Sequence, residues 1–534
     1  MWTPVALRGY SIIIAQPFQG KTETVSVTTP TILGASNFAT SYRSIDSINS
    51  VSAFEHSGAS FGRHTRYPGR PSLELCASLP RNNLKLSTKV EFRTGPGRQR
   101  TVEFSSRGIL TRSSSIGSKF GRHRINMGAA HSRSQAPNSL EISVNPDSFN
   151  KDLLSKIEIL KEPYKRPVFL RNRHVETIFA SFYRSLPKLT YERELLKMAD
   201  GGTVALDWPI GGEDEDVWRG QLEQDVPVLI LLPGLTGGSG DTYVRHMLVR
   251  ARRAGWRVAV FNSRGCGDSP VTTPQFYSAS FTEDLRQVVK HVGSLYPNSK
   301  VYAVGWSLGA NILVRYIGQE GDNCPLAGAV SLCNPFDLVL ANTEFHKGFN
   351  NVYNQNLASA LTKIFAKHAS LFEGIGGEFN VPLAANAKTV RDFDEGITRV
   401  SFGFKSVDEY YFYSSSSRNI KDVKIPLLCI QAQDDPIAPS AGIPRADIQS
   451  NLNCALVVSP AGGHLGWIAG QGGIFGPPWT DPLVMDYLRL LNKSVESRTA
   501  FATSRGQAGD VQLAGVETRE TSLEESTIAE PIVR

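Results

Sequence analysis

This sequence has few cysteines, few acidic residues near its N-terminus and no long apolar run. The longest apolar run near the N-terminus, YSIIIAQPF, is far below the roughly 18–20 residues that a membrane-spanning helix needs, and no other window is long enough. No C-x-x-C pair occurs, which favours free thiols in a reducing compartment over structural disulfides or a zinc site. The six cysteines are widely scattered, at Cys76, Cys266, Cys324, Cys333, Cys429 and Cys454.

The positive charge of the chain belongs to its N-terminal segment. Residues 1–140 contain 18 Lys and Arg against 6 Asp and Glu, whereas the remainder contains 39 against 44. Because this segment is Ser-rich and lacks a sustained helical or alternating period, we expect residues 1–145 to be disordered. An Arg- and Ser-rich, acid-poor leader is typical of an organellar transit peptide. The alternatives are a disordered cytosolic tail and a nucleic-acid-binding arm, although no interleaved aromatic and basic residues suggest an RNA platform.

The leader makes a first testable prediction. Residues 1 to about 60 should direct a fluorescent reporter to the chloroplast, with the mitochondrion as the alternative destination, and a disordered linker should follow the cleaved part. Microscopy of the fusion checks this expectation. A reporter that stays in the cytoplasm would contradict targeting and leave the chemistry of the remaining chain untouched.

The composition and the hydrophobic pattern of the sequence change near residue 150. Apolar, β-branched runs now alternate with amphipathic stretches of helical spacing; these runs cover 226–234, 256–265, 300–306, 326–335, 425–435 and 454–463. Such strands indicate an α/β fold with a mostly parallel sheet that is covered by helices on both faces. The turn signal Asp200-Gly201-Gly202 predicts an antiparallel hairpin ahead of it.

The bounds of this domain follow from where the alternation starts and stops. We expect the α/β domain to span 150–492 and a disordered polar tail to occupy 493–534. The interval 336–420 interrupts the alternation with helical pieces and the aromatic cluster DEYYFY. Because loops at the carboxyl ends of parallel strands form the binding sites of open α/β sheets, we interpret this insertion as a cap over a pocket.

Ser307 is the candidate nucleophile. It is the central residue of GWSLG, a G-x-S-x-G pattern between a predicted strand and a predicted helix. The sharp turn needs Gly305 and Gly309 where a Cβ would collide with backbone. A serine hydroxyl is a poor nucleophile at neutral pH, so it needs a base and an acid that orients the base. Where the nucleophile lies on such a strand-to-helix turn, the nucleophile, the acid and the base follow along the chain in the order Ser, Asp or Glu, His.

Chain order selects the base and the acid. Of the ten histidines only His346, His368 and His464 follow Ser307, and only His464 comes after the last core strands, in the loop PAGGHLGW. The loop QAQDDPIAP after the preceding strand offers Asp435 as the acid. Its neighbour Asp434 is the alternative, which we interpret as a turn residue that accepts backbone N–H bonds.

Two backbone amides are candidates for an oxyanion hole. Leu308 follows the nucleophile, and Leu235 lies in the glycine-rich loop LLPGLTGGSGD, where Gly234 lets the chain turn. Each such donor contributes about 3 kcal/mol in a transition state. A phosphate-binding loop is the alternative, but this stretch lacks the G-K-[ST] ending and the G-x-G-x-x-G spacing.

Seven stretches together resemble one α/β-hydrolase family: PVFLRNRHVETI, LLPGLTGGSGDTYVRHM, FNSRGCGDSPVTTPQFY, FTEDL, GWSLGANILVRYIG, QAQDDPIAP and GGHLGW. It contains YheT-type bacterial hydrolases, animal abhydrolase-domain proteins of the phospholipase and monoacylglycerol lipase kind, and plant embryogenesis-associated proteins. The resemblance covers residues 160–490 and implies a serine hydrolase of carboxylic esters, with Ser307, Asp435 and His464 in the family's catalytic positions. The stretch around His174 matches a segment to which we assign no chemistry.

The sequence therefore predicts a carboxylesterase or monoacylglycerol lipase that works through an acyl-enzyme and requires no metal or cofactor. An acyltransferase with the same residues is the alternative, although no acid stands at the fifth position after His464. A non-catalytic binding module is the third reading, which the presence of all three residues disfavours. We expect a small ester or acylglycerol as partner, no nucleic acid, and peripheral membrane contact as an option; the oligomeric state stays open.

Overall fold

The computed structural model describes residues 87–93, 99–105, 139–167, 170–219, 221–469 and 473–512, with side chains from 139 to 496. The predicted targeting segment and Cys76 lie outside these residues. Contacts divide the chain into two units, of which one is 6–129 and the other holds the remainder. In the first unit, β1 (Ser87–Arg93) and β2 (Gln99–Ser105) pair antiparallel. Everything below concerns the second unit.

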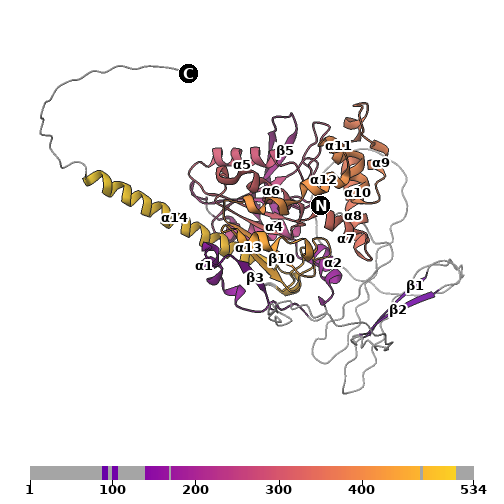
Figure 1. Ribbon diagram of the computed structural model, residues 1–534, viewed down its shortest axis with the longest axis horizontal. Coiled ribbons are helices and arrows are strands. Elements are labelled where there is room, and N and C mark those ends of the chain that lie inside the picture. Colours follow the sequence, from indigo (N-terminus) through magenta and orange to yellow (C-terminus); the bar gives the residue numbers. More distant parts are fainter. Residues whose placement is uncertain are drawn as a thin grey trace, which may run out of the picture. The chain divides into compact units, whose positions relative to one another are not determined.

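The described part of the second unit is built around one nine-stranded sheet (Figure 1). The strand order is β3-β11-β10-β9-β8-β6-β7-β5-β4, in which β7, β6, β8, β9, β10 and β11 are parallel. At one edge β3 pairs antiparallel with β11, and at the other β5 pairs antiparallel with both β7 and β4. The strands are β3 (Glu141–Val144), β4 (Leu189–Lys197), β5 (Thr203–Gly212), β6 (Val228–Leu232), β7 (Arg257–Asn262), β8 (Val301–Trp306), β9 (Gly328–Leu332), β10 (Leu427–Ala432) and β11 (Cys454–Ser459).

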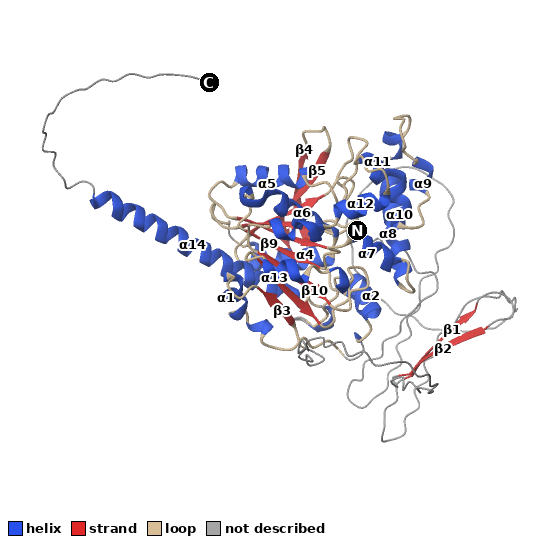
Figure 2. Ribbon diagram, in the orientation of Figure 1, coloured by secondary structure: helices blue, strands red, loops and turns tan. Residues whose placement is uncertain are grey.

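Helices cover both faces of the sheet (Figure 2). Alternate residues of β6 point to opposite faces: Leu229 and Leu231 pack in the core that contains α4 and α14, whereas Val228 and Ile230 pack in the core that contains α5 and α6. The sheet is therefore buried on both sides, as its uniformly apolar strands predict. The helices on the first face are α1 (Phe149–Ser155), α4 (Thr242–Arg253) and α14 (Thr480–Gln512); those on the second are α5 (Glu283–Leu295), α6 (Leu308–Glu320) and α13 (Arg445–Ser450).

Between β9 and β10 the chain forms a separate group of helices, which Figure 2 shows gathered to one side of the sheet. Their side chains form an aromatic cluster around Phe365, Phe372 and Phe393, which Phe276 from the segment before α5 joins. We call this group the cap. Its helices are α7 (Leu338–Phe345), α8 (Asn350–Ala366), α9 (Val381–Ala385), α10 (Val390–Phe393), α11 (Arg399–Ser401) and α12 (Val407–Ser414), with a π-helical turn at Asp394–Thr398.

The structure confirms the α/β class and the hairpin, but it corrects three boundaries. The sheet begins at β3, before the predicted domain start at 150, because four residues suffice for an edge strand on β11. Strands β1 and β2 lie inside the leader predicted to be disordered. Each alternates apolar and polar residues, but over only seven residues, so the composition of the whole segment outweighed this pattern in the prediction. Helix α14 continues to Gln512, past the predicted tail start at 493; Val495, just beyond that point, still packs against the core.

Candidate functional site

Ser307 occupies the sharp turn between β8 and α6. Its backbone has φ 52° and ψ −119°, a left-handed conformation that a non-glycine residue adopts only when its surroundings impose it. Two glycines allow the turn: a Cβ on Gly305 would lie 2.7 Å from the Gly309 carbonyl oxygen, and one on Gly309 would lie 2.3 Å from that of Leu232. The strand-to-helix context predicted for the G-x-S-x-G pattern is therefore present.

This close packing makes Gly309→Ala a strongly destabilising change. Neither the Leu232 nor the Pro233 carbonyl can move without displacing β6, so we expect a loss of about 3 kcal/mol or more in the free energy of unfolding. Gly293→Ala is the matched control, because it lies in α5 with no atom within 4 Å of the added Cβ and should stabilise by about 0.5–1 kcal/mol. Urea unfolding of both variants measures the difference; equal midpoints would contradict this account of the turn.

His464 lies within hydrogen-bond reach of Ser307. Its Nε2 is 3.0 Å from the Ser307 Oγ, although the two residues are 157 positions apart, and both side chains are buried. On the other side of the ring, Nδ1 is 2.9 Å from Oδ2 and 3.1 Å from Oδ1 of Asp435. A carboxylate can only accept, so the proton of the neutral ring stays on Nδ1 and the Nε2 lone pair faces the serine hydroxyl.

The two aspartates that follow β10 have different partners. Asp435 is held by the backbone N–H groups of Ile437 and Ala438, which donate to its Oδ1 at 2.7 and 2.8 Å and orient the carboxyl toward His464. Asp434 instead accepts from the backbone N–H of Gly463 at 2.9 Å and pairs with Arg166 at 3.1 Å. The expected division of roles, with Asp434 as an acceptor of backbone N–H, therefore has a geometric basis.

Burial raises the pKa of Asp434, and the N–H of Gly463 and the Arg166 guanidinium counteract that rise. A backbone amide and a guanidinium thus keep this second carboxyl away from the imidazole. The acid that touches His464 is Asp435 alone of the pair.

Helix α2 (Arg173–Tyr183) supports the loop that carries His464, a role that the sequence did not reveal. The hydroxyl of Thr177 accepts from the backbone N–H of His464 at 2.9 Å, and the buried Glu176 accepts from that of Ile468 at 3.1 Å. A Cβ on Gly463 would lie 2.4 Å from Thr177 Oγ1, so loop and helix fit only with glycine there. The motif RNRHVETI was the available signal, because it contains both Glu176 and Thr177.

His174 has its own surroundings, outside the hydrogen-bond chain just described. Its Nδ1 lies 3.1 Å from the Tyr353 hydroxyl, and its ring contacts that of Phe349. Burial, together with the charge of Arg173, lowers the pKa of His174. These contacts join α2 to α8 of the cap.

The backbone amides of Leu235 and Leu308 both lie beside Ser307. Within the described residues, neither N–H donates to a protein acceptor, although their neighbours Gly234 and Thr236 donate to the hydroxyls of Tyr243 and Tyr277. A Cβ on Gly234 would lie 3.2 Å from that of Ser307, which shows how closely this loop approaches the serine. Two free donors next to a serine hydroxyl are what an oxyanion would require.

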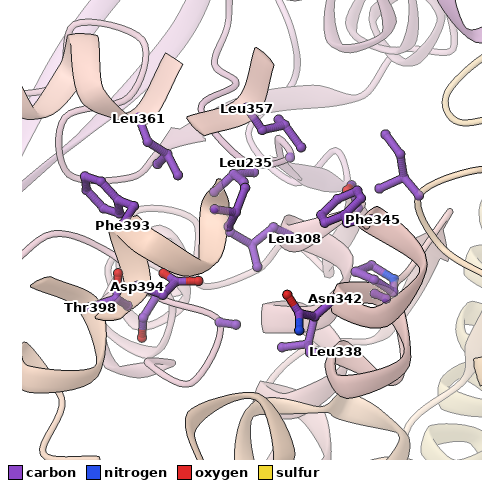
Figure 3. A pocket seen from close by; sticks show the side chains of 18 of the residues that line it. Leu235, Leu308, Leu338, Asn342, Phe345, Leu357, Leu361, Phe393, Asp394 and Thr398 are labelled. Carbon is purple, nitrogen blue, oxygen red and sulfur yellow. The ribbon is translucent and has the colours of Figure 1, made fainter. Parts of the chain in front are cut away.

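Ser307 and His464 line a pocket to which the cap also contributes. Figure 3 shows cap residues such as Phe345, Leu361 and Phe393 around it, together with Leu235 and Leu308. Its wall is mostly apolar, and helices α7, α8 and α10 contribute to it together with the two oxyanion candidates. The apolar lining residues from the cap are Leu338, Ala341, Phe345, Leu357, Leu361, Ile364, Val390 and Phe393. Such a lining suits the hydrocarbon part of a small organic substrate.

A buried acid, Asp394, interrupts this apolar wall. Burial raises its pKa from the ordinary value near 3.8 to about 6, against the lowering effects of hydrogen bonds from Thr398 and Tyr411 and of the charge of Arg391. The folded protein therefore binds this proton more tightly than the unfolded chain does. Its contribution to stability is complete below pH 3.8 and is lost as the pH rises through 6.

Asp394→Asn should consequently gain stability relative to the unmodified protein as the pH rises. We expect the difference in unfolding free energy between the two proteins to shift in favour of the variant by about 2 kcal/mol between pH 4.5 and pH 8, since an amide does not ionise there. Urea denaturation at the two pH values gives this difference directly. An unchanged difference would mean that the carboxyl does not titrate as described.

No cluster of three or more His, Cys, Asp or Glu residues with metal-binding geometry occurs in the described ranges. In the same part of the chain, every helix is either too short or too polar to cross a membrane.

Comparison with known proteins extends this picture. Residues 227–470 match the family model for the alpha/beta hydrolase fold. The embryogenesis-associated protein EMB8 of Picea glauca is 65% identical over 347 residues, which cover 65% of this chain and 76% of that protein. Phospholipase ABHD3 of Bos taurus is 35% identical over 326 residues, covering 61% and 78%, and a monoacylglycerol lipase of Saccharomyces cerevisiae is 32% identical over 345 residues, covering 57% and 76%.

The chain belongs to the α/β-hydrolase family, together with the plant EMB8, animal ABHD3 and yeast hydrolases. The resemblance read from the sequence motifs is thereby confirmed. Esterases and lipases are among its relatives.

Proposed function

We propose that this protein is a serine hydrolase that cleaves carboxylic esters, either short-chain esters or monoacylglycerols. The observation that carries the proposal is the unbroken chain of contacts from Ser307 Oγ to His464 Nε2 at 3.0 Å and from His464 Nδ1 to Asp435 Oδ2 at 2.9 Å. The apolar pocket that this chain faces supports an acyl group as the part of the substrate that binds there.

In the first half of the proposed reaction, His464 Nε2 removes the hydroxyl proton as Ser307 Oγ forms a bond to the ester carbonyl carbon. The negative charge moves to the carbonyl oxygen, where the amides of Leu235 and Leu308 stabilise it. Asp435 stabilises the imidazolium that has formed. The C–O bond to the alcohol then breaks, and His464 passes its proton to the departing alkoxide.

The second half repeats these steps with water. His464 takes a proton from a water molecule as the water oxygen attacks the acyl carbon, and the tetrahedral intermediate again places its charge between the two amides. When the bond to Ser307 Oγ breaks, the proton returns from His464 to the serine. A carboxylic acid leaves, and the cycle uses no metal or cofactor.

A substrate panel tests this function. Purified protein is given p-nitrophenyl esters from acetyl to palmitoyl and monoacylglycerols of matched chain length, and free acid is quantified with and without an added acceptor alcohol. Release of free acid supports a hydrolase, whereas transfer of the acyl group to the alcohol would favour the acyltransferase. No turnover of any ester by folded protein would contradict both and favour a binding module.

The location of the protein is a separate proposal. The basic leader, which precedes the described domain, supports import into the chloroplast, and the reporter fusion described above tests it. An acylglycerol would reach the pocket from a lipid surface, so peripheral membrane contact accompanies that choice of substrate.

A further inference from the structure

Phe393, Asp394 and Thr398 lie together at one side of the pocket (Figure 3). In that view Leu235 and Leu308 occupy the middle, and Asn342 and Phe345 lie on the opposite side. The hydroxyl of Tyr411, which also lines the pocket, donates to Asp394 Oδ2 at 2.8 Å. A carboxyl with two hydroxyl neighbours therefore faces a cavity whose other cap residues are mainly hydrocarbon. We call Asp394, Thr398 and Tyr411 the polar subsite.

The backbone at the polar subsite departs from a regular helix. Asp394–Thr398 is a π-helical turn between α10 and α11, a rare conformation that is frequent at functional sites. Gly396 makes the turn possible, because a Cβ there would lie 2.9 Å from the Asn380 carbonyl oxygen and 3.0 Å from the Ala384 nitrogen. The packing of α9 thus holds Asp394 in its position at the pocket wall.

The neighbouring cations are engaged elsewhere. Arg391 forms a two-pronged pair with Asp408 at 2.6 and 2.9 Å, and Arg399 pairs with Glu378 and Glu395 at 2.6 and 2.7 Å. Among the described residues no Lys or Arg forms an ion pair with Asp394. The charge of Arg391 lowers the pKa of Asp394 without contact between the two groups. With no cation paired to it the buried carboxyl still weakens the fold, and an asparagine or a leucine at this wall would avoid that penalty.

A purely structural role explains less of this arrangement. One hydrogen bond from Tyr411 ties α12 to the π-turn, but a carboxylate accepts about four hydrogen bonds. Among the residues that the structure describes, the side-chain donors to it are the two hydroxyls of the polar subsite. Asp394 can therefore accept further hydrogen bonds, and it lines the pocket. A ligand that donates a hydrogen bond from inside the pocket would complete the set.

We propose that the polar subsite binds a hydroxyl group of the substrate, with Asp394 as the acceptor. This inference rests on the proposed function and specifies its substrate class as hydroxyl-bearing esters. A hydroxyl is neutral and enters an apolar cavity at modest desolvation cost, whereas an ammonium group needs several acceptors and meets a single carboxylate here. The hydroxyl could belong to the acyl chain or to the alcohol part, and the two sources are separated by experiment.

Paired substrates provide that experiment. The acyl arm compares p-nitrophenyl decanoate with p-nitrophenyl decanoates that carry one hydroxyl at successive positions, and the alcohol arm compares monodecanoylglycerol with propyl decanoate. We expect kcat/KM to be about tenfold or more higher for a hydroxylated member of one arm, as for a hydrogen bond to a charged acceptor. In Asp394→Asn this ratio should fall at least fivefold. Glu373→Gln, which removes an exposed carboxyl of the same cap, should retain the ratio of the unmodified protein.

Binding measurements separate the failure of this inference from the failure of the proposed function. Decane-1,10-diol should raise the melting temperature of the unmodified protein more than decan-1-ol does, and Asp394→Asn should lose the difference. If no ester is hydrolysed but the diol preference holds, the hydroxyl subsite stands and the catalytic proposal falls. Hydrolysis with equal ratios in the unmodified protein and Asp394→Asn would overturn the subsite, as would stronger stabilisation by decylamine than by the diol.

Discussion

Ser307→Ala is expected to lower kcat for p-nitrophenyl butyrate by about 10⁶-fold while leaving the fold intact. The loss is large because the hydroxyl is the atom that becomes acylated, and removing it leaves only the oxyanion donors and the pocket to assist attack by water. Release of p-nitrophenol at high enzyme concentration measures the residual rate, and circular dichroism confirms that the variant is folded.

Ser294→Ala is the matched control for this variant, because that serine is exposed on α5 and its hydroxyl donates only to the Lys290 carbonyl. It should hydrolyse the ester at the rate of the unmodified protein. If Ser307→Ala retained more than about a tenth of the activity, another residue would have to be the nucleophile.

Asp435→Asn should lower kcat by about 10⁴-fold. An amide at this position can present an N–H to His464 Nδ1, which stabilises the ring tautomer whose proton lies on Nε2 and faces the serine, so the base is lost while its position is kept. The rate is measured with the same ester across pH 6–9, where a restored rate at high pH would reveal hydroxide acting in place of the base.

Asp434→Asn offers a comparison one residue away. Its side chain would lose the charge that pairs with Arg166 but could still accept from the Gly463 N–H, so we expect an activity within about tenfold of the unmodified protein. Larger damage from Asp434→Asn than from Asp435→Asn would reverse the assignment of the acid.

Much of the fold was readable from the sequence because the strands carry their own signal. Runs such as VLILL in β6 are buried on both faces, so no alternation is needed and the apolar run is the pattern. The order of Ser307, Asp435 and His464 could likewise be predicted, because each comes directly after a core strand. The edge strand β3 could not be predicted, since its stability comes from pairing with β11 instead of from a local pattern, and neither could the continuation of α14 past 493, where the sequence turns polar.

The residues around the reactive groups were harder to find. Thr177 supports His464 from 287 positions away in the chain, and a threonine in an amphipathic helix has no sequence mark of such a contact. Asp394 resembles any surface acid within RDFDEG, and only the π-turn and the fold of the cap bring it to the pocket wall. Long-range side-chain contacts of this kind are decided by tertiary packing, which single-sequence patterns do not encode.

The most direct test of the central claim is to locate the residue that a fluorophosphonate modifies. The reagent phosphonylates a serine only where a base and an oxyanion hole activate it, so peptide mass mapping of the treated protein should find one adduct, on Ser307, and none in His464→Ala. An adduct on a different residue, or an unmodified Ser307 in protein that hydrolyses esters, would contradict the account.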